Sequence, residues 1–268
     1  LIGPKKVVAF MAASASRRLI RVVTGDPYCP IRLSHPNAIT AIATPIKSLR
    51  CPSDITAATR NDAANVAPTV VALTSYKGIS GGNWGDGEAR WLWGTPNGPF
   101  SAPVGTTTHA GILNGNGMFF RADYLRRLKL SDITDGTSNT MMVSEMSDML
   151  QTVDGTKVNW STGWHGWFIG TGFNGTPPGG TNLADSRHFA CTSVRYKINQ
   201  KKGWTNGGDC NTGVCPNFGS NLPLNSTHTG GVNAGFVDGS VRFIRDSINL
   251  LALAQLSTRD DGQVITGD

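Results

Sequence analysis

The sequence predicts an α+β fold in which β-strands and turns dominate. Charged residues make up only 16% of the 268 residues and glycine fills 33 positions, which is typical of a turn-rich β domain rather than a bundle of long helices. Near the C-terminus, Asp238-Gly239 lies between two runs of alternating apolar residues and predicts a β-hairpin. The apolar-rich segment Ile248–Leu256 then predicts one short C-terminal helix.

The distribution of charge and of helix-breaking residues divides the chain into two regions. Residues 1–50 hold eight basic side chains and one acidic side chain, so the net charge of +6 arises at this end and the remainder is nearly neutral. We expect an atypical basic segment over 1–45 and a β-rich domain over 46–268. No stretch approaches the roughly 18–20 apolar residues of a membrane span, so we expect no span in this chain. A basic terminal segment is more often a solvated terminus than a binding arm, so we also expect no nucleic-acid partner.

Within the domain, short apolar runs bounded by turn residues predict the strands. Val70–Tyr76 reads as one buried strand, and the Gly-rich stretch Ser80–Gly87 that follows reads as a surface loop. Thr140–Glu145 and Thr192–Ile198 are two further predicted strands of an antiparallel sheet. A capped turn over Ser131–Asn139, which contains Asp135, Gly136, Ser138 and Asn139, precedes the first of these.

The C-terminal hairpin is the most sharply predicted element. A two-residue type I′ turn at Asp238-Gly239 fixes the pairing of its strands and therefore the face that each side chain occupies. This register places four side chains on the core face: Phe236 opposite Val241, and Ala234 opposite Phe243. Asp246 is the expected N-cap of the helix that follows.

The five cysteines favour disulfides, and with them a location outside the cytoplasm. Cys210 and Cys215 are close enough in sequence to pair, and Cys51 with Cys191 is a second candidate pair that leaves Cys29 unpaired. The alternative is a zinc site made of His188, Cys191, Cys210 and Cys215, but their spacing fits no strong zinc pattern. We therefore predict no metal site and no cofactor.

The sequence contains few patterns typical of catalysis or ligand binding. An enzyme would need His165, His188 or His228 beside a nucleophile and an acid, and no local signature supports this. We therefore predict that the protein is not an enzyme. Six tryptophans in Gly-rich regions are candidates for contact with a glycan or a small solute: Trp84, Trp91, Trp93, Trp160, Trp164 and Trp167.

Several motifs in a fixed order resemble one family. His228 is followed, after nine residues, by Asp238-Gly239, and an earlier motif runs from Ile133 to Thr140 with Glu145 shortly after it. Further landmarks precede these motifs or lie between them: Leu49–Asp54, Thr74–Tyr76, Gly115–Phe119 and Pro223–Ser226. Over about residues 46–268, the chain resembles a large family of prepilin-like proteins in planctomycete bacteria whose domain has no known function.

The resemblance implies a pilin-like, β-rich head with structural motif residues and no catalytic ones. These residues are Asp135, Gly136, Ser138, Asn139, Glu145, His228, Asp238 and Gly239. The implied function is that of a non-enzymatic structural protein of the pseudopilin type, extracellular or in the cell envelope, with filament or envelope proteins as partners. Residues 1–45 depart from the family pattern, because they contain neither the cleavage motif nor the hydrophobic helix. The alternative function is a secreted module that binds a glycan or small solute on the Trp-rich loops.

Overall fold

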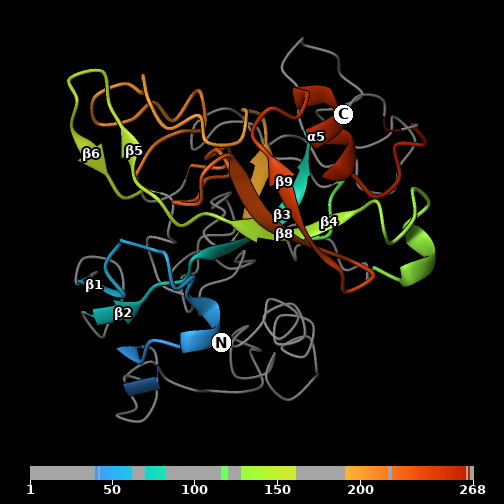
Figure 1. The fold of residues 1–268 in the computed structure, drawn as a ribbon, viewed down its shortest axis with the longest axis horizontal. Coiled ribbons are helices and arrows are strands. Elements are labelled where there is room, and N and C mark those ends of the chain that lie inside the picture. Colours follow the sequence, from blue (N-terminus) through green and yellow to red (C-terminus); the bar gives the residue numbers. More distant parts are fainter. Residues whose placement is uncertain are drawn as a thin grey trace, which may run out of the picture.

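A five-stranded mixed sheet organises the computed structural model, which describes residues 40–41, 43–61, 70–82, 116–119, 128–160, 191–216, 219–263 and 265. The strand order is β7-β3-β4-β8-β9 (Figure 1). The bounds are β3 (Tyr76–Gly82), β4 (Met141–Glu145), β7 (Cys191–Val194), β8 (Gly231–Phe236) and β9 (Val241–Arg245). The β-dominated α+β class is confirmed, but the purely antiparallel sheet is wrong, because β3 and β7 run parallel.

Smaller elements lie around this sheet. Two antiparallel pairs are separate from it, β1 (Thr59–Asn61) with β2 (Val70–Ala72), and β5 (Leu150–Gln151) with β6 (Lys157–Val158). Two short 3-10 helices are η1 (Lys47–Leu49) and η2 (Leu130–Asp132). Figure 1 shows β1, β2 and η1 on one side of the sheet and α5 (Leu250–Leu256) on the other.

Strand β3 differs from its prediction at both ends. The predicted strand Val70–Tyr76 is divided between β2 and β3, and β3 continues through Gly82 into the predicted Gly-rich loop. The glycines here permit close packing instead of forming a loop. A Cβ atom on Gly82 would lie only 2.5 Å from the carbonyl oxygen of Ala254, so α5 rests directly on this strand.

The hairpin of β8 and β9 exists, but its predicted register is wrong by one residue. The backbone N–H of Phe236 donates to the oxygen of Ser240, so the loop has three residues, Val237 to Gly239. Only Gly239 adopts a positive φ, of 84°, which is typical of a three-residue turn that ends in a left-handed residue. Ala234 consequently lies opposite Arg242 rather than Phe243.

This shift of one residue reverses the faces of β9. Phe243, expected in the core, is 47% exposed, whereas Ile244, expected on the opposite face, is buried opposite Val232. Val241 likewise leaves the core face, since it pairs with Gly235. Along β8, Val232, Ala234 and Phe236 are all buried, so the predicted core residues of this first strand stay correct.

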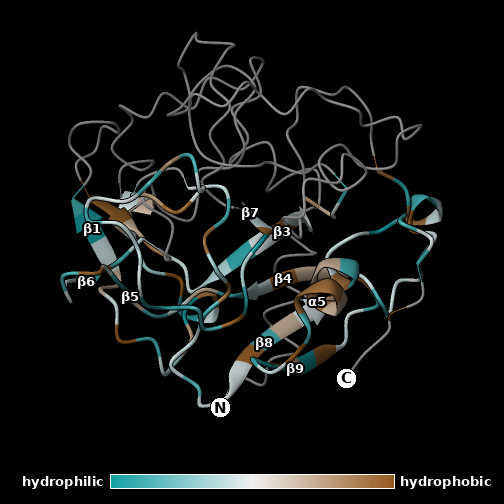
Figure 2. Ribbon diagram, turned by 90° about the horizontal axis from the view of Figure 1, so that it is seen from above, coloured by the Kyte–Doolittle hydropathy of each residue, from teal (hydrophilic) through white to brown (hydrophobic). Residues whose placement is uncertain are grey.

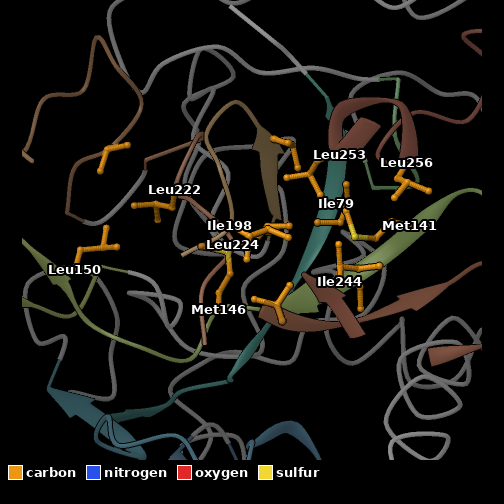
Figure 3. Packing of buried hydrophobic residues seen from close by; sticks show 14 of the residues in the cluster. Ile79, Met141, Met146, Leu150, Ile198, Leu222, Leu224, Ile244, Leu253 and Leu256 are labelled. Carbon is orange, nitrogen blue, oxygen red and sulfur yellow. The ribbon is translucent and has the colours of Figure 1, made fainter. Parts of the chain in front are cut away.

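The core lies between the sheet and α5. Asn249, and not Asp246 as predicted, is the N-cap of α5, because its side chain accepts a hydrogen bond from the backbone N–H of Leu251. Leu253 and Leu256 of α5 pack with Ile79, Met141 and the β8 residues (Figure 3). Figure 2 shows that α5 is mostly apolar and lies across the sheet. Met146, Leu150, Ile198, Leu222 and Leu224 extend the same core toward β5.

The two remaining predicted strands are found with altered limits. Thr140–Glu145 corresponds to β4, which begins at Met141. The strand predicted over Thr192–Ile198 is β7, which is shorter and spans Cys191–Val194. The chain then turns at Asn199, whose φ is +58°. The predictions for residues 1–39 concern a segment that lies outside the described residues.

Candidate functional site

Three chemically reactive side chains, Cys51, Glu145 and His228, meet at the end of β4, the central strand of the sheet; we call them the Cys–Glu–His cluster. The sulfur of Cys51 lies 3.5 Å from Nε2 of His228, and that nitrogen lies 3.4 Å from Oε1 of Glu145. One ligand-type atom from each residue falls within 4.8 Å of the others. Residues as far as 177 positions apart in sequence are thereby brought together.

Cys51 is held in place by a hydrogen-bonded turn that follows η1. Its backbone N–H donates to Oγ of Ser75 at 2.9 Å, and the Ser75 hydroxyl donates in turn to Asp54. Asp54 also forms an ion pair with Arg50 at 3.0 Å and accepts hydrogen bonds from Thr56. The backbone at Cys51 is therefore held by a chain of hydrogen bonds, and the residue is buried.

Glu145 is the last residue of β4 and is only 2% exposed. Both of its carboxylate oxygens are occupied by Asn233 on the neighbouring strand β8. The backbone N–H of Asn233 donates to Oε2 at 2.8 Å, and its side-chain amide donates to Oε1 at 3.1 Å. These two bonds satisfy a buried carboxylate that burial alone would strongly disfavour, and they turn Oε1 toward His228.

His228 lies in the loop that enters β8 and gives the cluster its contact with solvent. Its side chain is 34% exposed, while its backbone N–H donates to Oγ of Ser226 at 3.2 Å. The preceding residue, Thr227, donates from its hydroxyl to the oxygen of Ser53 at 2.7 Å. The loop before β8 is thus bonded to the turn that carries Cys51.

The electrostatics of the cluster do not activate the cysteine as a nucleophile. Burial raises the pKa of the Cys51 thiol, the backbone at Ser53 lowers it, and the carboxylates of Glu145 and Asp54 raise it further. The pKa of Tyr76, which pairs with Glu145 across β3 and β4, is also raised, first by burial and then by charges of this cluster. Catalytic cysteines instead have lowered pKa values.

The geometry also differs from a nucleophile–base–acid relay. In such a relay, the two ring nitrogens of histidine face different partners, one the nucleophile and the other the acid. Here the single nitrogen Nε2 of His228 faces both Cys51 and Glu145. The three side chains therefore converge on a common point, an arrangement that suits a bound cation better than the transfer of a proton.

The turns at Asp135-Gly136 and Asp238-Gly239 meet at the opposite end of strands β4 and β8. We call this group the turn cluster: the turn 135–140, the hairpin loop 237–239 and the segment 259–262. The N–H of Asp238 donates to the oxygen of Thr137 at 3.1 Å. The carboxylate of Asp135 accepts from the backbone N–H groups of Asp261 and Gly262, at 2.8 and 2.9 Å.

The remaining predicted residues of the turn cluster act on the backbone. Gly136 adopts a φ of +94°, and Asn139 donates from its side chain to the oxygen of Asp135. Ser138 is exposed in the same turn. Asp135 and Asn139 also line an open pocket of about 460 Å³ with Asp261 and Gln263. That these residues shape turns rather than a reaction centre stays a prediction.

The cysteine predictions divide. Cys210 and Cys215 form a disulfide, which confirms one of the two candidate pairs. The pairing of Cys51 with Cys191 is wrong, since both are free and buried and Cys51 lies in the Cys–Glu–His cluster. The alternative zinc set fails as well, because two of its members are joined in the disulfide. Cys29 and His188, like His165, lie outside the described residues.

Of the six candidate tryptophans, the structure describes only Trp160. It is 6% exposed and belongs to the core, as does Trp204, so these two rings fill space between loops and sheet. The other candidates fall outside the described residues: Trp84, Trp91, Trp93, Trp164 and Trp167.

Sequence reasoning named all three members of the Cys–Glu–His cluster but did not group them. Glu145 and His228 were expected as structural residues, and Cys51 as half of a disulfide. The prediction of no metal site overlooked this group of three ligand types. One signal was present, since each member lies in or beside a different motif of the family resemblance. Comparing motif residues by their chemistry rather than by their order would have suggested the group.

Comparison with known proteins identifies a family but no activity. A family model described as a protein of unknown function (DUF1559) matches residues 27–251 of the chain. No curated protein and no solved structure matches. The matched region contains the whole Cys–Glu–His cluster, both Asp-Gly turns and the disulfide.

Proposed function

We propose that this chain, which belongs to the DUF1559 family of proteins of unknown function, is the head of a non-enzymatic structural protein of the pseudopilin type. Its place would be the cell envelope or the cell surface, and its partners would be filament or envelope proteins. The single observation that carries the proposal is that hydrogen bonds from motif residues join distant parts of the chain at two ends of the sheet.

At the first end, the motifs around Cys51, Ser75 and Asn225 are linked by backbone hydrogen bonds. The N–H of Ser75 donates to the oxygen of Leu49 at 2.9 Å, and the N–H of Met146 donates to the oxygen of Ser75 at 2.8 Å. The N–H of Ser147 then donates to the oxygen of Asn225 at 3.0 Å. Residues from three distant motifs thereby support one another.

At the second end, the turn cluster joins the hairpin loop and the C-terminal segment to the chain before β4. Arg259, which is 1% exposed, donates to the oxygen of Gly117 at 2.6 Å and binds a further motif to this end. This use of motif residues supports a structural role. Their side chains stabilise turns and connect segments of the chain, which is what a structural domain requires of its sequence motifs.

The disulfide agrees with the proposed location. Disulfides persist in oxidising compartments and are rare in the cytoplasm, so the bond between Cys210 and Cys215 indicates a protein outside the cytoplasm. Among the described residues, no helix has both the length and the apolar character that a bilayer crossing requires. A binding module on the Trp-rich loops stays an alternative proposal, and the buried Trp160 gives it no support.

The proposal is tested by locating the native protein in the cells that produce it. An antibody against this chain is used to label intact cells and to probe three fractions: material sheared from the surface, envelope and cytoplasm. We expect labelling of intact cells and enrichment in the sheared or envelope fraction, with a cytoplasmic enzyme as the control for lysis. Recovery in the cytoplasm, or only as free monomer in the culture medium, would contradict a structural role in the envelope.

A further inference from the structure

We propose that Cys51, Glu145 and His228 bind one zinc ion and leave a fourth position open to solvent. This inference rests on the geometry of the Cys–Glu–His cluster alone. It goes beyond the proposed structural function and does not depend on it.

Two of the three distances between the ligand atoms match those around one tetrahedral ion, and the third, between Cys51 and Glu145, is at most 4.8 Å. With zinc bonds of about 2.3 Å to sulfur and about 2.0–2.1 Å to nitrogen or oxygen, tetrahedral angles separate sulfur from nitrogen by about 3.6 Å and nitrogen from oxygen by about 3.4 Å. The structure has 3.5 Å between Sγ of Cys51 and Nε2 of His228, and 3.4 Å between that nitrogen and Oε1 of Glu145. The three atoms are therefore close enough to share one ion.

The set of donor atoms favours zinc among common metals. Calcium and magnesium prefer oxygen ligands and would not use the sulfur of Cys51. A thiolate, an imidazole and a carboxylate together suit zinc, which is borderline in softness and accepts all three. Zinc also has no redox chemistry, so it is compatible with the oxidising compartment that the disulfide between Cys210 and Cys215 indicates.

The surroundings already orient the ligands. Asn233 fixes the carboxylate of Glu145 through two hydrogen bonds, and Ser75 fixes the backbone at Cys51. Partners of this kind hold metal ligands in position and tune the affinity of the site. The partial exposure of His228 offers a path by which the ion and a water molecule can enter.

Zinc at this point would join three segments that are distant in sequence. Cys51 belongs to the segment after η1, Glu145 ends β4, and His228 precedes β8. A metal that binds only the folded chain stabilises it. Bound zinc would consequently fasten the segment around η1 to the sheet.

The test uses the full chain with its disulfide intact, freed of metal with a chelator and then titrated with zinc in competition with a chromophoric chelator. We expect one zinc per chain and a rise of the melting temperature on binding. The variants Cys51→Ser, Glu145→Gln and His228→Ala should each weaken zinc binding at least about tenfold. Cys191→Ser is the matched control, because Cys191 is the other buried free cysteine that the structure describes and lies outside the cluster.

Cobalt gives a second readout that needs no variant. Cobalt added to the metal-free wild-type chain should produce the near-ultraviolet charge-transfer band of a thiolate ligand, and zinc should abolish it. Folded wild-type protein that binds no stoichiometric zinc and shows no such band would overturn the proposal. So would folded cluster variants whose affinity equals that of wild type, or a loss of binding caused by Cys191→Ser.

Discussion

Lys77 is a buried lysine, and its burial disfavours the charged form of its side chain. It lies in β3 with 3% exposure, beside the strand that carries the buried thiol of Cys191. Burial lowers the pKa of Lys77 to about 8, although Cys191 acts slightly in the opposite direction. Burial likewise raises the pKa of Cys191 to about 12. The buried Cys191 thiol therefore stays neutral up to high pH, whereas Lys77 loses its charge in the folded protein only above about pH 8.

This burial makes stability depend on pH in a defined sense. Between pH 8 and the pKa of an exposed lysine, the unfolded chain binds a proton that the folded chain has lost, so the free energy of unfolding rises with pH. Above about pH 9, Cys191 opposes this rise, because its thiol ionises only in the unfolded chain. The window in which Lys77 dominates is thus pH 8–9.

We predict that Lys77→Met is more stable than wild type at pH 7 and that this advantage shrinks by about 1 kcal/mol between pH 8 and 9. Urea unfolding of both proteins at pH 7, 8 and 9 measures the difference, and taking the difference removes the contribution of groups common to both. An advantage that stays constant with pH would show that Lys77 does not titrate as its burial requires.

Among the elements, the β8–β9 hairpin illustrates how a correct motif can give a wrong register. Asp-Gly is compatible with a two-residue type I′ turn and also with a three-residue loop that ends in a left-handed glycine. The hydrogen bonds of Thr137 and Thr140 to the hairpin loop come from another part of the chain. No local pattern contains that information, and one added loop residue moves every side chain of β9 to the other face.

The hairpin register is tested by two phenylalanines. Phe236→Ala should lower the free energy of unfolding by about 3–5 kcal/mol or prevent folding, because the ring is fully buried. Phe243→Ala should cost less than about 1 kcal/mol, because its ring is half exposed. Thermal and urea unfolding compare the two. Equal costs would favour the register with a two-residue turn, in which both rings face the core.

Elements with a strong local signal were predictable from sequence, and those set by distant contacts were not. β4, the hairpin and α5 are found close to their predicted positions, since each has an apolar pattern with turn residues at its ends. β3 was misjudged because its glycines serve contact with α5, which a local reading cannot detect. The Cys–Glu–His cluster could not be predicted for the same reason, because its members are far apart in sequence and no regular spacing relates them.

At the scale of the whole molecule, the two ends of β4 and β8 act as the fastening points of the fold. The Cys–Glu–His cluster lies at Glu145 and the turn cluster at Thr140, and the strands between them bury the core side chains. His228 and Asp238 thus lie beyond opposite ends of β8, a strand of six residues that is about 20 Å long at the usual rise. The motif that contains them therefore contributes one residue to each of two separate clusters and does not form a single site.

The central claim is that this chain is the head of a pseudopilin-type structural protein. The most direct measurement is mass-spectrometric sequencing of the N-terminal region of the native protein, isolated from the cells that produce it. The account predicts a mature chain in which a long hydrophobic helix precedes this head. A native chain that begins after an ordinary cleaved secretory signal, with no such helix, would contradict the claim and move the binding-module proposal to first place.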